Sequence, residues 1–256
     1  LKAADIGIAM GITGTDVAKE ASDMVLADDN FASVVAAVDE GRAIFTRLRN
    51  VLFYSLNTNL SELVVLILSI FFLGKSPLAA VQILWLNLVT DTAGDVPLGF
   101  EPKLNDELKQ PPRRQGVGLI YPGLFLRILT MAELIGVGSF FIFLSDDARM
   151  GVDHARTLAF CSVAAFEWFM AFSARSDEHT VLRIGLFKNR VLVVSIGLAV
   201  LLQLAAVYVP FLQTAFHTVP LEAIDWAVIL AAAGGLFLLE EARKALFPKL
   251  FSLGKW

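Results

Sequence analysis

Oxygen-bearing side chains recur at helical spacing inside two long apolar runs of this sequence. In the first run, spacings of four and three residues place three such side chains on one helical face: Ser55, Asn59 and Glu62. In the second run, three lie at successive i, i+4 positions and a fourth lies beside the middle one: Asn87, Asp91, Asp95 and Thr90. A later run carries Glu167 near its middle. Ionisable groups are costly in apolar surroundings, so the pattern predicts a functional site.

The chemistry that these side chains share is the binding of a hard cation. Carboxylate, carboxamide and hydroxyl oxygens suit such ions, and calcium takes about 6–8 of them. The apolar runs hold no thiolate or imidazole at these depths, which argues against a soft metal. If the two helices form a hairpin, Glu62 and Asp91 are expected to face each other. Gly94 and Pro97 are expected to interrupt the second helix and to free backbone carbonyls near Asp91.

Several polar residues have a second interpretation. Ser55, Asn59 and Thr90 are of the types that form hydrogen bonds between membrane helices. Asp95 fits either a ligand or a side chain that lines a vestibule, and the sequence does not choose between these roles.

Four other residues and one turn are interpreted as structural. Glu133 is assigned no role in binding, and Arg127 is expected to extend to the membrane interface. Gly136 and Gly138 are expected to allow close helix packing. The turn at residues 11–14 has a weak phosphate-loop pattern and is interpreted as a plain turn.

Composition places the chain among membrane proteins. Of its 256 residues 56% are hydrophobic and the mean hydropathy is +0.67, whereas soluble domains have about 45–50% apolar residues. The net charge of −4 gives no indication of a nucleic-acid partner. Cys161 is the single cysteine, so an intramolecular disulfide is impossible.

Six apolar stretches are long enough to cross a bilayer, which takes about 20 residues. They are roughly 51–73, 78–100, 119–144, 157–174, 191–212 and 222–240. The segment Gly74–Pro77 predicts a tight hairpin between the first two. Only three basic residues would fall on one side of the membrane, namely Lys75, Arg149 and Arg156. Both ends and the 101–118 loop are therefore expected in the cytoplasm.

The first 40 residues have a different character. Asp5–Gly11 and Met24–Leu26 are predicted as short strands, and Thr15–Ser22 as a helix capped by Thr13 or Thr15. Asp28–Asn30 is expected to cap a helix that runs from Phe31 towards Arg49. So short an α/β segment is too small to fold alone. Since the first residue is Leu, we expect an N-terminal part to be missing.

Five motifs carry a resemblance to P-type cation-transporting ATPases, and most of all to calcium pumps of the sarcoplasmic-reticulum type. They are Ala4–Gly11 (ADIGIAMG), Ala21–Phe31 (ASDMVLADDNF), Glu40–Ile44 (EGRAI), Trp85–Asp91 (WLNLVTD) and Pro111–Arg113 (PPR). The sequence departs from the family after Asp91, where Thr92–Gly94 replaces the usual Gly-Leu-Pro and Asp95 is added. The loop 145–156 is short and has no cysteines, which favours a prokaryotic-like pump.

The resemblance implies a mainly α fold: a six-helix transmembrane bundle after a short α/β remnant of the phosphorylation (haloacid-dehalogenase-like) domain. It divides the chain into the edge of that domain at 1–40, a stalk at 41–50, a hairpin of the family's fifth and sixth helices at 51–100, a cytoplasmic loop at 101–118 and a four-helix part at 119–256. It also implies a set of ion ligands on the fifth, sixth and eighth helices: Asn59, Glu62, Asn87, Thr90, Asp91 and Glu167. Glu62 and Glu167 match a site that single-calcium pumps lack, so a two-site pump is implied.

The implied function is the membrane part of an ATP-driven pump that exports calcium from the cytoplasm, in the plasma membrane. Its partners would be the bilayer and the missing N-terminal part, which would hold the phosphorylated aspartate and the ATP and Mg²⁺ sites, so this chain alone is expected to be inactive. Alternatives are a P-type pump for sodium, potassium, protons or manganese, and a passive cation channel or carrier.

Overall fold

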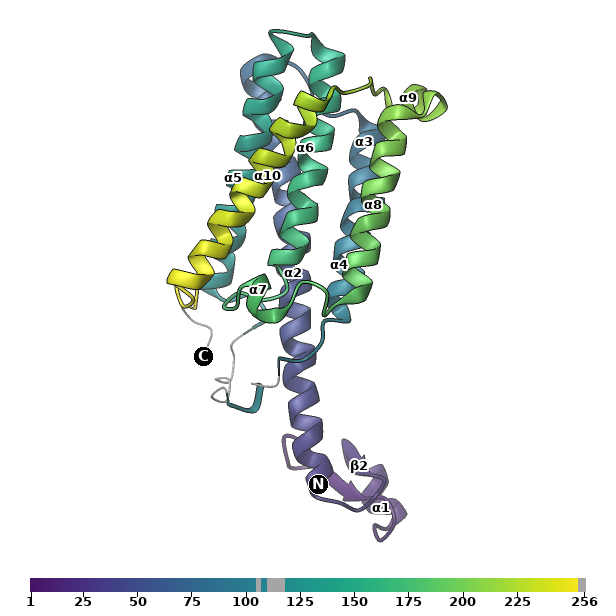
Figure 1. Cartoon of the computed structure of the whole chain (residues 1–256). Helices are drawn as coiled ribbons and strands as arrows, with labels where there is room; N and C mark the ends of the chain where they lie inside the picture. The colour runs from purple at the N-terminus through teal and green to yellow at the C-terminus, as the bar shows by residue number, and fades with distance from the viewer. Residues whose placement is uncertain (105–106, 110–117, 253–256) are drawn as a thin grey trace. The chain divides into compact units, whose positions relative to one another are not determined.

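A computed structural model describes residues 1–104, 107–109 and 118–252 as a mainly α chain with one short two-stranded parallel sheet (Figure 1). The described residues form two compact units. The first comprises 1–46 with 103–104 and 107–109, and the second comprises 47–102 and 118–252.

The first unit holds the sheet. Strand β1 (Ile8–Met10) pairs in parallel with β2 (Met24–Leu26), in the register Ile8 to Met24. Helix α1 (Asp16–Glu20) connects them, and its first turn is capped by Thr15, whose Oγ1 accepts a hydrogen bond from the Ala18 N–H at 3.2 Å. The predicted strand–helix–strand order is confirmed, with β1 and α1 shorter than the predicted ranges.

Two of the three predicted capping residues after β2, Asp28 and Asn30, bond to the start of the next helix. The Asn30 Oδ1 accepts from the Ala32 N–H at 2.9 Å, and the Asp28 carboxylate accepts from the Ser33 hydroxyl at 2.8 Å. Helix α2 (Ala32–Leu73) then runs for 42 residues without a break. The predicted stalk and the first predicted span are therefore parts of one helix.

The turn after β1 is held by Asp29, which has a left-handed φ of 51°. Its carboxylate accepts hydrogen bonds from the N–H groups of Ile12 and Thr13 at 2.8 and 2.7 Å. The Ile12 bond is the main reason that the pKa of Asp29 lies below its usual value. Because this carboxylate already accepts from those amides, the segment is a plain turn, as the sequence predicted.

Among the described residues, five helices are long and apolar enough to cross a membrane; four lie in the second unit, and α2 begins in the first unit and continues into the second. They are α2, α5 (Pro122–Asp147), α6 (Val152–Ser173), α8 (Arg190–Tyr208) and α10 (Ala223–Leu246). Short helices lie between them in the sequence: α7 (Val181–Ile184) and α9 (Pro210–Phe216). In the first unit, Glu107–Lys109 form the 3₁₀ turn η2.

The predicted span 78–100 is divided into three segments. Helix α3 (Ala80–Trp85) leads into a π-helical segment, η1 (Leu86–Asp91), and then into α4 (Thr92–Gly99). The predicted interruption at Gly94 and Pro97 is wrong, since both residues lie inside α4. The irregular backbone precedes them and ends at Asp91.

Glycines allow two of these helices to approach α2 closely. A Cβ at Gly136 of α5 would lie 2.6 Å from the Cβ of Val64, and a Cβ at Gly94 of α4 would overlap the Tyr54 ring. Gly138 faces Phe166, where a Cβ would lie 3.3 Å from the ring. The predicted packing role of Gly136 and Gly138 is confirmed, and Gly94 serves the same purpose.

Helix α6 is the most buried of the five long helices. It contacts α5 and α10 along its length, and α8 packs beside α4 (Figure 1). Within the second unit, Glu167 of α6 therefore lies in the interior of the bundle with no exposed surface.

Candidate cation site

The widened turn η1 positions the polar face of the second predicted span. Thr90 and Asp91 are buried in it, at 1% and 5% exposure. On its α3 side, the Trp85 indole N–H donates to Gln203 Oε1 of α8 at 2.9 Å. The Tyr54 hydroxyl lies 3.4 Å from the Thr90 carbonyl oxygen. π-Helical turns are rare and are found frequently at functional sites, and this one carries three of the six predicted ligands.

Three cross-helix pairs join α2 to η1 and α4. Asn87 Nδ2 donates to Glu62 Oε2 at 2.9 Å, and Asn59 Nδ2 lies 3.4 Å from Asp91 Oδ2. The third pair is the shortest, with the Ser55 hydroxyl donating to Asp95 Oδ2 at 2.6 Å. Each pair matches one carboxylate with one neutral side chain. The pairs follow opposite sequence orders on the two segments, as expected for a hairpin. The predicted pairing of Glu62 with Asp91 is not observed, because Glu62 pairs with Asn87 and Asp91 with Asn59.

One oxygen of each carboxylate in these pairs has no hydrogen-bond partner although it is buried. The unpartnered atoms are Glu62 Oε1, Asp91 Oδ1 and Asp95 Oδ1. Glu167, opposite on α6, has both carboxylate oxygens buried and unpartnered. Within the described residues, none of these four carboxylates forms an ion pair with a Lys, Arg or His.

The four carboxylates lie on elements that pack against one another. Helix α6, which carries Glu167, contacts both η1 and α4, which carry Asp91 and Asp95. A buried charge without a partner costs several kcal/mol, by order of magnitude, so an arrangement of this kind needs a compensating positive charge. A bound cation would supply it.

The carboxylates alone are not arranged to coordinate a single ion. Among the described residues, no three His, Cys, Asp or Glu side chains are close enough together to hold one metal ion. Any ion here would need neutral oxygens as well. Asn59 and Asn87, which are both exposed in this chain, donate through their amide nitrogens, so their amide oxygens remain available as neutral ligands.

Asn57 of α2 is a polar residue that the sequence interpretation missed. It is fully buried and neither polar atom of its side chain has a partner, and the same is true of the indole N–H of Trp168, next to Glu167. An asparagine inside an apolar run was the available signal, but its position is off the face that carries Asn59 and Glu62.

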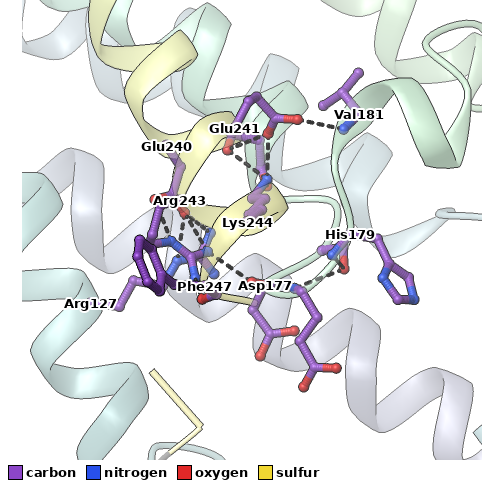
Figure 2. A network of polar contacts seen from close by, with 12 residues as sticks. Arg127, Asp177, His179, Val181, Glu240, Glu241, Arg243, Lys244 and Phe247 are labelled. Carbon is purple, nitrogen blue, oxygen red and sulfur yellow. Dashed lines mark hydrogen bonds and ion pairs between the residues drawn. The ribbon is translucent and has the colours of Figure 1, made fainter. Parts of the chain in front are cut away.

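A second polar network joins the ends of α5, α6 and α10, and Figure 2 shows it from close by. Arg127 of α5 forms an ion pair with Glu240 of α10 at 2.8 Å, and its guanidinium lies 3.8 Å from the centre of the Phe53 ring. Arg243 bonds to the same carboxylate, and Lys244 donates to Ser173 and Glu241 (Figure 2). The expectation that Arg127 extends to the interface is wrong, because its side chain is only 2% exposed and is paired.

A third network joins the ends of α4, α6 and α8 through Glu101. Its carboxylate accepts from Arg175 Nε and Nη2 and from Asn189 Nδ2, at 2.8 to 3.0 Å. Arg175 in turn accepts, through its carbonyl, from Asn50 of α2 at 2.8 Å. This carboxylate is fully paired, in contrast to those of the cross-helix pairs.

Apolar helices surrounding a widened turn with buried, unpaired carboxylates define an integral membrane protein with an acidic interior. The family described as "Cation transporting ATPase, C-terminus" matches residues 75–246, and the chain belongs to this family.

Curated relatives extend the match to nearly the whole chain. Over 254 residues it is 41% identical to a Mus musculus protein named "Calcium-transporting ATPase type 2C member 2", covering 98% of the chain and 27% of that protein. Over 246 residues it is 38% identical to "Calcium-transporting ATPase 1" of Saccharomyces cerevisiae, covering 95% of the chain and 26% of that protein. Over 246 residues it is 37% identical to the Bacillus cereus protein of the same name, covering 90% of the chain and 28% of that protein. The chain thus spans 26–28% of the length of these relatives.

The comparisons correct the resemblance in one respect. The mouse relative carries a type 2C name and the other two a general one, so the narrower likeness to reticulum-type pumps is not supported. The wider class, the C-terminal region of P-type cation-transporting ATPases, is supported. The PPR motif at residues 111–113 lies outside the described residues.

Proposed function

We propose that this chain is the ion-translocating membrane part of an ATP-driven P-type pump that moves calcium out of the cytoplasm. The observation that carries the proposal is the set of buried, unpartnered carboxylate oxygens on Glu62, Asp91 and Glu167. Calcium, a hard dication, would compensate their charge. The names of the relatives favour calcium over the alternatives of sodium, potassium, protons or manganese.

The proposed ligands lie on α2, η1 and α6: Asn59, Glu62, Asn87, Thr90, Asp91 and Glu167. Asp91 is central among them, because it follows Asn87 by one helical turn and lies beside Asn59. The π-helical turn supports this role, since it shifts the positions of the side chains that a regular helix would present. An ion would draw the separate pairs together, which would complete a coordination shell that the carboxylates alone do not form.

We propose six crossings of the plasma membrane, with both ends in the cytoplasm. The segment from α3 to α4 covers residues 80–99, whose length of about 30 Å at 1.5 Å per residue matches the hydrocarbon core. It would form the sixth crossing beside the five long helices. The asymmetry of the basic residues supports this orientation.

The domain assignment follows the same proposal. Residues 1–40 would be the edge of a haloacid-dehalogenase-like phosphorylation domain, 41–50 its stalk, 51–100 the ligand-bearing hairpin, 101–118 a cytoplasmic loop and 119–256 a four-helix part. The phosphorylated aspartate and the sites for ATP and Mg²⁺ would belong to the remainder of the polypeptide, so this chain alone would not hydrolyse ATP. A passive channel would not account for the α/β segment.

Phosphorylation of the full-length protein tests the proposal. Asp91→Asn keeps the size of the side chain and removes its charge, so it should abolish calcium-dependent phosphorylation by ATP. Phosphorylation by inorganic phosphate needs no bound ion and should persist, which shows that the variant is folded. The matched control is Asp153→Asn at a side chain that is 74% exposed. Normal calcium dependence in Asp91→Asn would refute the site.

A further inference from the structure

The pair Ser55–Asp95 continues the row of cross-helix pairs beyond the six proposed ligands. Asp95 follows Asp91 by one turn of α4, and Ser55 precedes Asn59 by one turn of α2. The two carboxylates are therefore offset by about 6 Å along the helix axis, at 1.5 Å per residue. The third pair lies on the side towards residue 101, where the proposed cytoplasmic loop begins.

Asp95 lacks the partners that a structural carboxylate has in this protein. The carboxylate of Glu101, six residues further along the chain, accepts hydrogen bonds from Arg175 and Asn189. Asp95 accepts one bond, from Ser55, and its Oδ1 is buried without a partner. Asp95 therefore keeps one buried carboxylate oxygen that is open to a ligand.

The surroundings of that oxygen favour a cation. Glu167, whose helix α6 contacts α4, has no exposed surface, and both of its carboxylate oxygens lack a partner. No described basic side chain forms an ion pair with Asp95. Asp95 and Ser55 are both half-buried, whereas Asp91 is 5% exposed and its partner Asn59 is exposed.

We propose that Asp95 and Ser55 form an additional binding position for the transported cation, between the main site and the cytoplasmic side. The inference rests on the proposed function. An ion arriving from the cytoplasm coordinates Asp95 Oδ1 and the Ser55 oxygen, and then moves one helical turn to Asp91 and Asn59. Successive positions of one carboxylate and one neutral oxygen agree with the finding that no three acidic side chains enclose a single point among the described residues.

Two substitutions in the full-length protein separate coordination from other roles. Asp95→Asn preserves an acceptor for Ser55 and removes the charge. Ser55→Ala preserves the charge and removes the hydroxyl. The measurement is the free calcium concentration that gives half-maximal phosphorylation by ATP, together with the rise of phosphoenzyme after calcium is added to calcium-free protein. Phosphorylation by inorganic phosphate reports folding, and Asp153→Asn is the matched control.

Coordination predicts that both variants need more calcium and respond more slowly. Asp95→Asn should raise the half-maximal concentration by about tenfold, equivalent to about 1.4 kcal/mol. Ser55→Ala should raise the half-maximal concentration by a smaller factor. The double variant should raise it by less than the product of the two single factors, because both residues contribute to one binding position.

The other outcomes overturn the inference. If both variants match Asp153→Asn while Asp91→Asn abolishes the calcium response, the additional position is refuted and the proposed function stands. If only Asp95→Asn raises the half-maximal calcium concentration, the charge of Asp95 acts at a distance and Ser55 does not coordinate the ion. If Asp95→Asn does not fold, Ser55→Ala alone tests the additional position. An unchanged half-maximal calcium concentration in Ser55→Ala then refutes it. A normal response in Asp91→Asn would overturn the proposed function itself.

Discussion

Glu101→Gln is expected to destabilise the second unit strongly, because it breaks a buried ion pair without removing the partner charge. Glu101 is 5% exposed and Arg175 is fully buried at the side chain. The carboxylate accepts from Arg175 Nε and Nη2 and from Asn189. An amide has one oxygen and one NH₂ group, so at least one donor would face another donor. Breaking such a pair costs about 3–5 kcal/mol.

The assay is the half-life of the solubilised full-length protein at a fixed raised temperature, followed as the monodisperse fraction in size-exclusion chromatography. This readout does not depend on the proposed activity. The half-life should shorten by more than about tenfold, since about 1.4 kcal/mol already corresponds to a factor of ten. Glu20→Gln, at an exposed position of α1, is the control. Adding Arg175→Gln should restore part of the half-life, because the unpaired charge is gone. A half-life for Glu101→Gln equal to that of the control would refute the reasoning.

Two further predictions concern packing and topology. Gly94→Ala should destabilise the protein by about 1–3 kcal/mol and shorten the same half-life, because the added methyl overlaps the Tyr54 ring. The control Gly99→Ala should leave the half-life unchanged, because a Cβ there meets nothing within 4 Å. Equal half-lives for the two variants would contradict the packing argument. Tags placed after residue 256 and at His217 should be reached by an impermeant label from opposite sides of the membrane, and labelling of both from one side would contradict six crossings.

The two polar helix faces and their hairpin were predictable because they depend on short-range geometry, whereas the exact pairing across the hairpin was not. Spacings of three and four residues place Asn59 and Glu62 on one face, and a short hairpin loop brings Asn87 and Asp91 opposite. The structure pairs these residues two by two. Likewise, the caps at Thr15 and Asn30 involve residues two or three positions away, within reach of sequence patterns.

Features that depend on distant partners were not predictable. Arg127 was predicted to be an interfacial residue. Its ion-pair partner, Glu240, could not be foreseen because it is 113 residues further along the chain. Gly94 looked like a helix breaker, whereas its lack of a Cβ makes room for Tyr54 of α2. The π-helical turn at Leu86–Asp91 has no residue-type signature in this sequence, and its extra residue per turn depends on the packing around it.

Calcium binding at equilibrium tests the central claim most directly. The purified full-length protein should bind radioactive calcium in the absence of ATP, and Glu167→Gln should lower the bound calcium per phosphorylation site while phosphorylation by inorganic phosphate persists. The reason is that both oxygens of Glu167 are buried without a partner, so a bound ion would depend on them. Glu20→Gln should bind as much as the unaltered protein. Equal calcium binding by Glu167→Gln and the unaltered protein, with both folded, would contradict the account.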